Sequence, residues 1–137
     1  MTFPVTEVQS LLKASGTCTL DSAGYGVILL DPDNARQRWE VASVVVQTNQ
    51  AATATVVPVA TVAVNTTDIS VLSPGNNRGQ SWSGNQDVFS GQVDIGPCDT
   101  LSIGFSPPPG ATVDQIADLS GVICTAVVTG SKFTRRN

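Results

Sequence analysis

Histidine is absent from this chain of 137 residues. Its absence excludes the usual Ser-His-Asp and Cys-His catalytic arrangements and removes the commonest ligand of zinc and other transition metals. The three cysteines, Cys18, Cys98 and Cys124, are widely spaced and contain no CxxC pair, so we expect neither a zinc site nor a disulfide framework. They are expected to be small buried hydrophobic residues, or one bridge with one thiol left over. We expect no cofactor.

Charge is also scarce, since only 13% of the residues are charged and the formal net charge is −4. A negative balance excludes the general electrostatic footprint of a nucleic-acid-binding protein. Asp31, Asp33 and Asn34 form an acidic cluster, but Ala35 and Arg36 stand where a calcium loop needs a ligand and a glycine. The cluster is therefore interpreted as a turn. Paired carboxylates of a carbohydrate-active enzyme are a further option that nothing in the sequence favours, so we predict a non-enzymatic protein.

Long apolar runs are missing too. No stretch approaches the roughly 18–20 apolar residues of a membrane span. The first residues, MTFPVTEVQSLL, lack the basic start and apolar core of a signal peptide, so we expect a protein made in a cytoplasm, not exported by that route, and with no membrane contact. No phosphate-binding glycine loop occurs, and GYG at 24–26 is interpreted as a tight turn.

What the chain does contain is a pattern of short strands. In the segment 96–111, Leu101, Ile103 and Phe105 alternate with small polar residues. Period two indicates a strand with one buried face, and the glycines and prolines on both sides mark its ends. Further strands are predicted at residues 17–21, 25–30, 38–49, 53–64, 67–72, 87–95 and 121–130.

Three details refine this prediction. Apolar residues on both faces of 38–49, with Trp39 in the core, indicate a central strand. Pro58 cannot donate a backbone hydrogen bond, so 53–64 is expected to be an edge strand or to contain a bulge. Residues 112–119 fit either a strand or one helical turn. Together the elements predict one all-β domain over residues 1–137, an antiparallel β-sandwich resembling a jelly roll.

A short helix is expected before the sandwich, at residues 4–15. Val5, Val8, Leu11 and Leu12 fall on one helical stripe, and Gly16 is a natural stop. Such an N-terminal helical segment, residues 1–16, would either cap its own sandwich or lie on a neighbouring subunit. These four apolar residues are therefore candidate partner contacts.

Two other segments break the strand pattern. Trp82 lies in the polar loop 73–86, where an aromatic side chain serves as a sugar platform or a protein contact, or folds back over its own core. The C-terminal segment 131–137 carries Lys132, Arg135 and Arg136, whereas all eleven acidic residues precede it. A basic tail on an acidic body either docks on an acidic neighbour or is simply solvated.

The stretch VDIGPCDTLSIGFSPPPGATV, residues 93–113, together with the strand 38–49, resembles small β-sandwich virion proteins of tailed bacteriophages. The residues that carry the resemblance are Gly96 to Asp99, the alternating apolar residues after them, and Pro109 to Thr112. It implies a structural subunit within the virion, in capsid decoration, head–tail attachment or the tail. Its partners would be other virion proteins in a symmetric homo-oligomer, with no catalytic residues. The alternative is a glycan-binding or host-adhesion module that uses Trp82.

Overall fold

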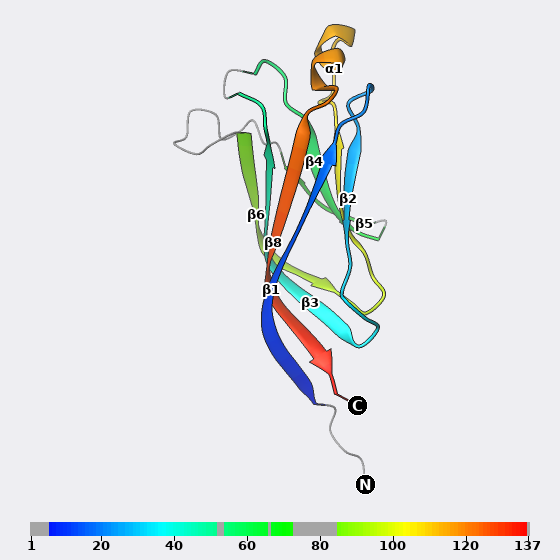
Figure 1. The fold of residues 1–137 in the computed structure, drawn as a ribbon, viewed down its shortest axis with the longest axis vertical. Coiled ribbons are helices and arrows are strands. Elements are labelled where there is room, and N and C mark those ends of the chain that lie inside the picture. The colour runs from blue at the N-terminus through cyan, green and yellow to red at the C-terminus, as the bar shows by residue number, and fades with distance from the viewer. Residues whose placement is uncertain (1–5, 52–53, 66, 73–84, 137) are drawn as a thin grey trace.

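The structure is a computed structural model that describes residues 6–51, 54–65, 67–72 and 85–136. The described residues form strands and one short helix (Figure 1). In chain order these are β1 (Glu7–Thr19), β2 (Gly26–Leu30), β3 (Gln37–Thr48), β4 (Val59–Val64), β5 (Thr67–Leu72), β6 (Asn85–Ile95), β7 (Leu101–Ser106), α1 (Val113–Leu119) and β8 (Ile123–Arg135).

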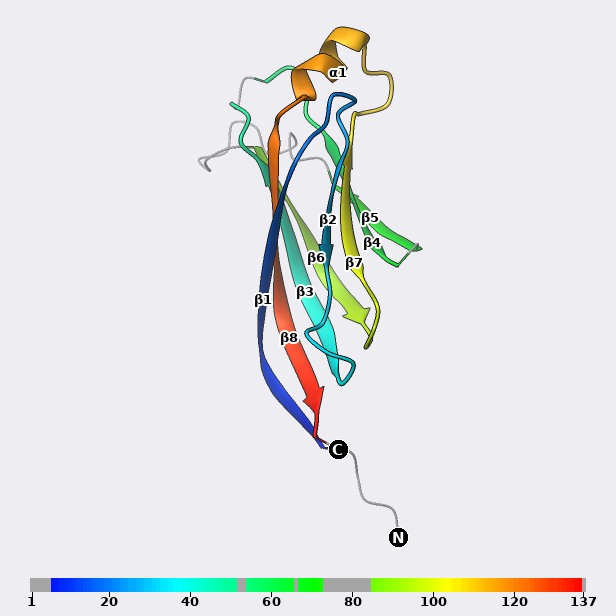
Figure 2. The same cartoon turned by 45° about the vertical axis from the view of Figure 1, so that its right-hand side comes forward.

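The strands form two four-stranded sheets, with the orders β1-β8-β3-β6 and β2-β7-β4-β5 (Figure 2). Every pairing is antiparallel. The pairs β1·β8, β2·β7, β3·β6 and β4·β5 are nested, as if one long hairpin had been folded across both sheets. This is the strand order of a jelly roll. The predicted all-β antiparallel sandwich is confirmed.

The core lies between the two sheets and follows the alternation that the sequence shows. On β7, Leu101, Ile103 and Phe105 are buried, as predicted. Trp39 on β3 is buried too, and its indole nitrogen donates a hydrogen bond of 2.9 Å to the side-chain oxygen of Gln37. A buried indole N–H needs such a partner, because leaving it unpaired would cost free energy.

A β-bulge explains the two-sided apolar pattern of β3. Trp39 and Val41 face the core before the bulge, whereas Val44 and Val46 face it afterwards, so the inward side changes parity. The register with both neighbouring strands shifts between Val41 and Ser43. The strand is central, as predicted. Its apolar residues occupy odd positions before the bulge and even positions after it, because the bulge adds one residue to the strand.

The predicted N-terminal helix is wrong, because residues 7–19 form strand β1. This strand pairs with β8 over its full 13 residues, which satisfies its backbone groups in a sheet. Leu12, Ala14 and Cys18 belong to the core or pack against it, and all three are even-numbered positions, as one face of a strand requires. The helical stripe shares Leu12 with this pattern, and pairing with β8 overrides the local helical preference. Val5 lies outside the described residues.

Pro58 has a different role from the one expected. Strand β4 begins after Pro58, so the missing N–H lies outside the ladder, and the strand is central between β7 and β5. The edge-strand alternative is therefore wrong. A bulge does occur in β4, but it lies between Val62 and Ala63.

Residues 113–119 adopt the helical alternative. Thr112 starts α1 with a capping box: its hydroxyl accepts a hydrogen bond from the Gln115 backbone N–H at 3.2 Å, and the Gln115 side chain accepts one from the Thr112 N–H at 2.9 Å. Leu119 is fully buried, so α1 closes one end of the sandwich.

Candidate binding surfaces

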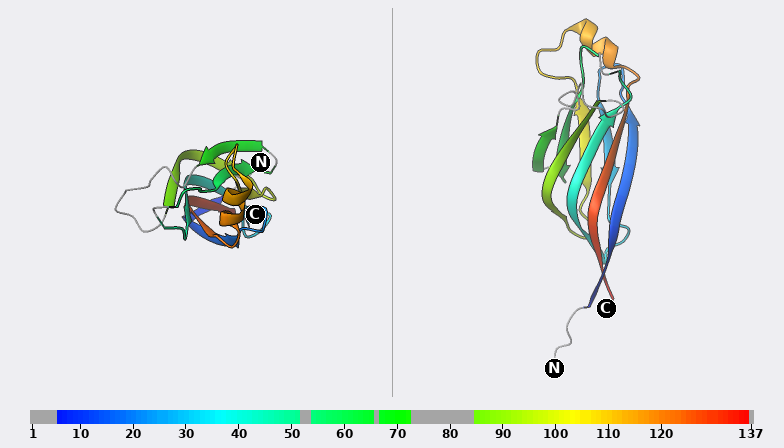
Figure 3. Two further views of the ribbon diagram at one scale, coloured as in Figure 1. Left: turned by 90° about the horizontal axis from the view of Figure 1, so that it is seen from above. Right: turned by 90° about the vertical axis from the view of Figure 1, so that its left-hand side faces the viewer.

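The first candidate surface is the end of the β1–β8 ribbon that lies opposite α1, where β8 stays paired with β3 as far as Thr134 (Figure 2, Figure 3). We call residues 6–11 and 131–136 the arm. Leu11 is 80% exposed and Val8 is 39% exposed, whereas Leu12 is 2% exposed and belongs to the core. The arm therefore presents apolar side chains to solvent, and the core begins immediately after it.

The predicted basic tail is part of the arm. Residues 131–135 continue strand β8, and the backbone N–H of Arg136 donates a hydrogen bond to the Thr6 carbonyl at 2.9 Å. Lys132 lies 3.8 Å from the Asp33 carboxylate, measured from its ammonium nitrogen. The structure thus brings Val8, Leu11, Lys132, Arg135 and Arg136 together at one end of the molecule.

Arg38, on β3, connects the arm to the rest of its sheet through ion pairs. Its guanidinium donates to both carboxylate oxygens of Glu7, at 2.9 and 3.0 Å, and to Glu40 at 2.8 Å. It also lies over the ring of Phe133, 4.2 Å from the centroid. The hydrogen bonds from Arg38 lower the pKa of Glu7. This network could not be predicted from the sequence, because only the pairing of the strands brings Glu7 near Arg38.

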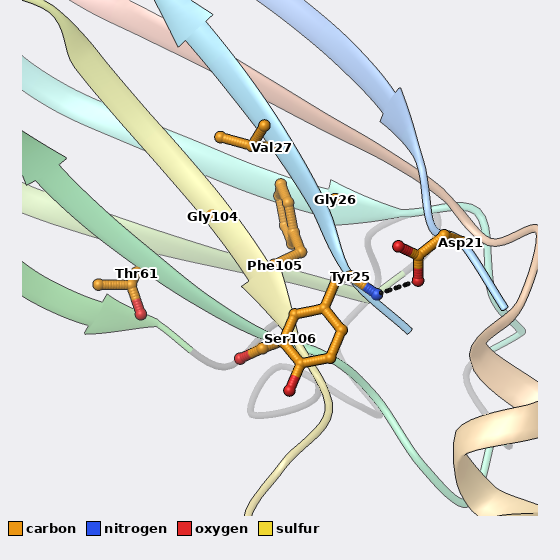
Figure 4. A pocket seen from close by; sticks show the side chains of 8 residues that line it. All are labelled: Asp21, Tyr25, Gly26, Val27, Thr61, Gly104, Phe105 and Ser106. Carbon is orange, nitrogen blue, oxygen red and sulfur yellow. Dashed lines mark hydrogen bonds between the residues drawn. The ribbon is translucent and has the colours of Figure 1, made fainter. Parts of the chain in front are cut away.

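The second candidate surface is a hollow on the outer face of β2, β7 and β4, nearer the α1 end (Figure 4). It is an open depression of about 510 Å³, not an enclosed cavity. Tyr25, 55% exposed, stands beside Ser106 at its edge. Gly104 lies in its floor and Thr61 on its far side.

Asp21 sets the geometry at the start of β2. One oxygen of its carboxylate accepts hydrogen bonds from the backbone N–H groups of Ala23 at 2.9 Å and Tyr25 at 3.0 Å. This is a turn held by an aspartate side chain, and it fixes the backbone from which the Tyr25 ring projects. GYG at 24–26 is in the tight turn that the sequence predicted, but the exposed ring of Tyr25 was not anticipated.

The cysteines are unbridged. Cys18 and Cys124 are direct partners across β1 and β8, and Cys98 is exposed in the loop before β7. Burial raises the pKa of Cys124 from 9.0 to about 12, and burial also raises the pKa of Cys18. The prediction of small buried hydrophobic residues is therefore confirmed for Cys124, holds in part for the half-buried Cys18, and is wrong for Cys98.

Within the described part of the chain, no group of three or more His, Cys, Asp or Glu residues is placed to hold a metal ion. The same part of the chain contains no helix long and apolar enough to cross a membrane. Trp82 and the rest of residues 73–84, like Val5, lie outside the described residues.

Comparison with known proteins gives no family. No protein-family model matches the chain, and no curated protein matches it. Among solved structures, a chain of turnip yellow mosaic virus matches with a TM-score of 0.48 at 11% identity, over 97% of this chain and 95% of that one. Dimeric latent PorU from Porphyromonas gingivalis matches with a TM-score of 0.39 at 11% identity, over 93% of this chain but 13% of that one. Neither likeness is close enough to carry an argument about function.

Proposed function

We propose that the chain is a non-enzymatic structural subunit of a tailed-phage virion, in capsid decoration or in head–tail or tail attachment. It acts by binding other virion proteins in a symmetric assembly of its own copies. Two observations support this. Residues 93–113 and 38–49 resemble such virion proteins, and the jelly-roll strand order is one that viral capsid domains use. A shared fold does not imply a shared function, so the stronger support comes from the exposed surface of the arm.

The arm is the observation that carries the proposal. β1 is an edge strand, and its pairing with β8 uses the backbone of even-numbered residues such as Thr6 and Leu20. The backbone groups of Glu7, Gln9 and Leu11 therefore point away from β8. An edge that offers backbone groups beside exposed Val8 and Leu11 fits the addition of a strand from a neighbouring subunit.

The proposal is tested with phage particles that lack this protein. Purified protein is added at about micromolar concentration, where a specific subunit should bind, and the particles are sedimented. We expect the wild type to sediment with the particles and Leu11→Ser to lose most of this binding. The matched control is Leu29→Ser, because Leu29 is 61% exposed but lies on β2 in the other sheet.

Two results would contradict the proposal. One is a wild-type protein that stays in the supernatant at this concentration. The other is equal binding by Leu11→Ser and Leu29→Ser, which would remove the arm from the contact. Thermal unfolding of both variants checks that each is folded, since neither side chain belongs to the core.

A further inference from the structure

The hollow beside Tyr25 arises from one missing side chain. Val27, Gly104 and Thr61 are consecutive register partners across β2, β7 and β4, so they form one row across the outer face of the sheet. The middle position is a glycine, and a Cβ placed there would meet nothing within 4 Å. The row therefore has raised sides and an open centre, and the Tyr25 ring stands next to it (Figure 4).

The walls of this hollow combine an aromatic ring with several hydrogen-bonding groups. The hydroxyls of Tyr25, Thr61 and Ser106 line it, and none of them hydrogen-bonds to another described residue. Asp21 contributes a carboxylate at the rim. Its position is fixed by the hydrogen bonds that it accepts from two backbone N–H groups. An exposed ring surrounded by hydroxyls and a carboxylate offers both apolar contact and directional hydrogen bonding.

We propose that this hollow binds a neutral pyranose sugar. A pyranose has an apolar face of C–H groups that stacks on an aromatic ring, and an edge of hydroxyls that hydrogen-bonds to alcohols and carboxylates. The open space over Gly104 accommodates the ring, with Val27 on one side and Thr61 on the other. Asp21 is the charged group at this hollow, so an anionic sugar is disfavoured.

This site is separate from the arm. The hollow lies on the sheet that does not contain β1 and β8, nearer the α1 end (Figure 4). A subunit held to a particle by its arm would thus leave the hollow open to solvent. The inference does not depend on the virion role, because a protein with no particle partner would still bind the sugar.

The test uses the intact protein and the methyl pyranosides of glucose, galactose, mannose and N-acetylglucosamine as probes. Saturation-transfer NMR detects binding, and ¹⁵N-labelled protein reports where it occurs through the amide signals of Gly26 and Gly104. We expect at least one glycoside to bind and to shift these signals. Tyr25→Ala should weaken binding about tenfold, the effect of losing one aromatic contact, whereas Tyr25→Phe should weaken it less.

Gly104→Val is the decisive variant, because it places a branched side chain in the open centre of the hollow, where nothing lies within 4 Å of an added Cβ. It should abolish binding while the protein stays folded, as circular dichroism will show. Leu29→Ala is the control and should bind as the wild type does, because Leu29 lies on β2, two residues beyond Val27, but does not line the hollow.

The proposal is overturned if no glycoside shifts the two glycine signals, or if the shifts persist in Gly104→Val. Shifts caused by an aromatic peptide but by none of the glycosides would also overturn it, and would make the hollow a protein contact instead.

Discussion

At the scale of single residues, two glycines on neighbouring sheets have opposite requirements. A Cβ on Gly130 would overlap the carbonyl oxygen of Glu40 and crowd the backbone of Val41, where β3 bulges against β8. Backbone atoms cannot move aside as a flexible side chain can. We expect Gly130→Ala to lower the free energy of unfolding by about 1–3 kcal/mol, as overpacking does, measured by urea denaturation.

Gly104 supplies the control for this prediction, because nothing lies within 4 Å of an added Cβ there. Gly104→Ala should change stability by no more than about 0.5 kcal/mol, as an unconstrained surface substitution does. Equal effects at the two positions would mean that the bulge tolerates a side chain and that the parity change of β3 has another cause.

The cysteines differ in reactivity for a reason that is also local. Thiolate is the reactive form, and burial disfavours it at Cys124, whose pKa rises to about 12, and at Cys18, whose pKa also rises. Cys98 is exposed. At pH 8 one thiol per folded protein molecule should react quickly with a disulfide reagent such as Ellman's reagent. The other two thiols should react only after the protein is unfolded by denaturant.

Cys98→Ser should eliminate the fast phase, while Cys124→Ser should leave it unchanged. A fast phase that survives in Cys98→Ser would show that the β1–β8 pair opens readily in the folded protein.

At the scale of elements, α1 depends on Thr112, the residue immediately before it. The helix has only seven residues, too few to be stable alone, and it is held by the Thr112 capping box and by the buried Leu119. Thr112→Ala removes the acceptor for the Gln115 N–H and should cost about 1 kcal/mol of unfolding free energy, as the loss of a cap does. Thermal or urea unfolding measures this loss.

Thr112→Ser keeps the hydroxyl and should retain most of that stability. If alanine and serine destabilise the protein equally, the hydroxyl is not what holds the start of the helix.

The elements also show where sequence reasoning succeeds. Strand β7 was predictable because Leu101, Ile103 and Phe105 alternate without interruption and prolines mark the end. Strand β1 was not, because its outer half is exposed on both sides and carries no alternation to detect. There the decisive information is the pairing with β8, more than a hundred residues away along the chain. Strand β3 lies between these cases, since its position was predictable but its bulge was not.

At the scale of the whole molecule, the sandwich was predictable from the count and spacing of strands, but the strand order was not. Which strands pair depends on contacts distant in sequence, and so do both candidate surfaces. The arm exists because β1 pairs with β8 along its whole length and forms the edge of its sheet, and the hollow exists because Gly104 lies between Val27 and Thr61. The pairing of β1 with β8 is also what brings the predicted contact residues Val8, Leu11 and Lys132 together on the arm.

The nested pairing has a mechanical consequence. Thr6 and Arg136 are hydrogen-bonded to each other at the same end of an antiparallel pair. A force that pulls these two residues apart therefore acts perpendicular to the strands. It separates β1 from β8 by breaking their hydrogen bonds one after another. A force applied between Thr6 and Cys124 instead acts along the strands and loads many of these hydrogen bonds at once. We therefore expect single-molecule pulling to meet little resistance between the first two attachment points and much more between the second two.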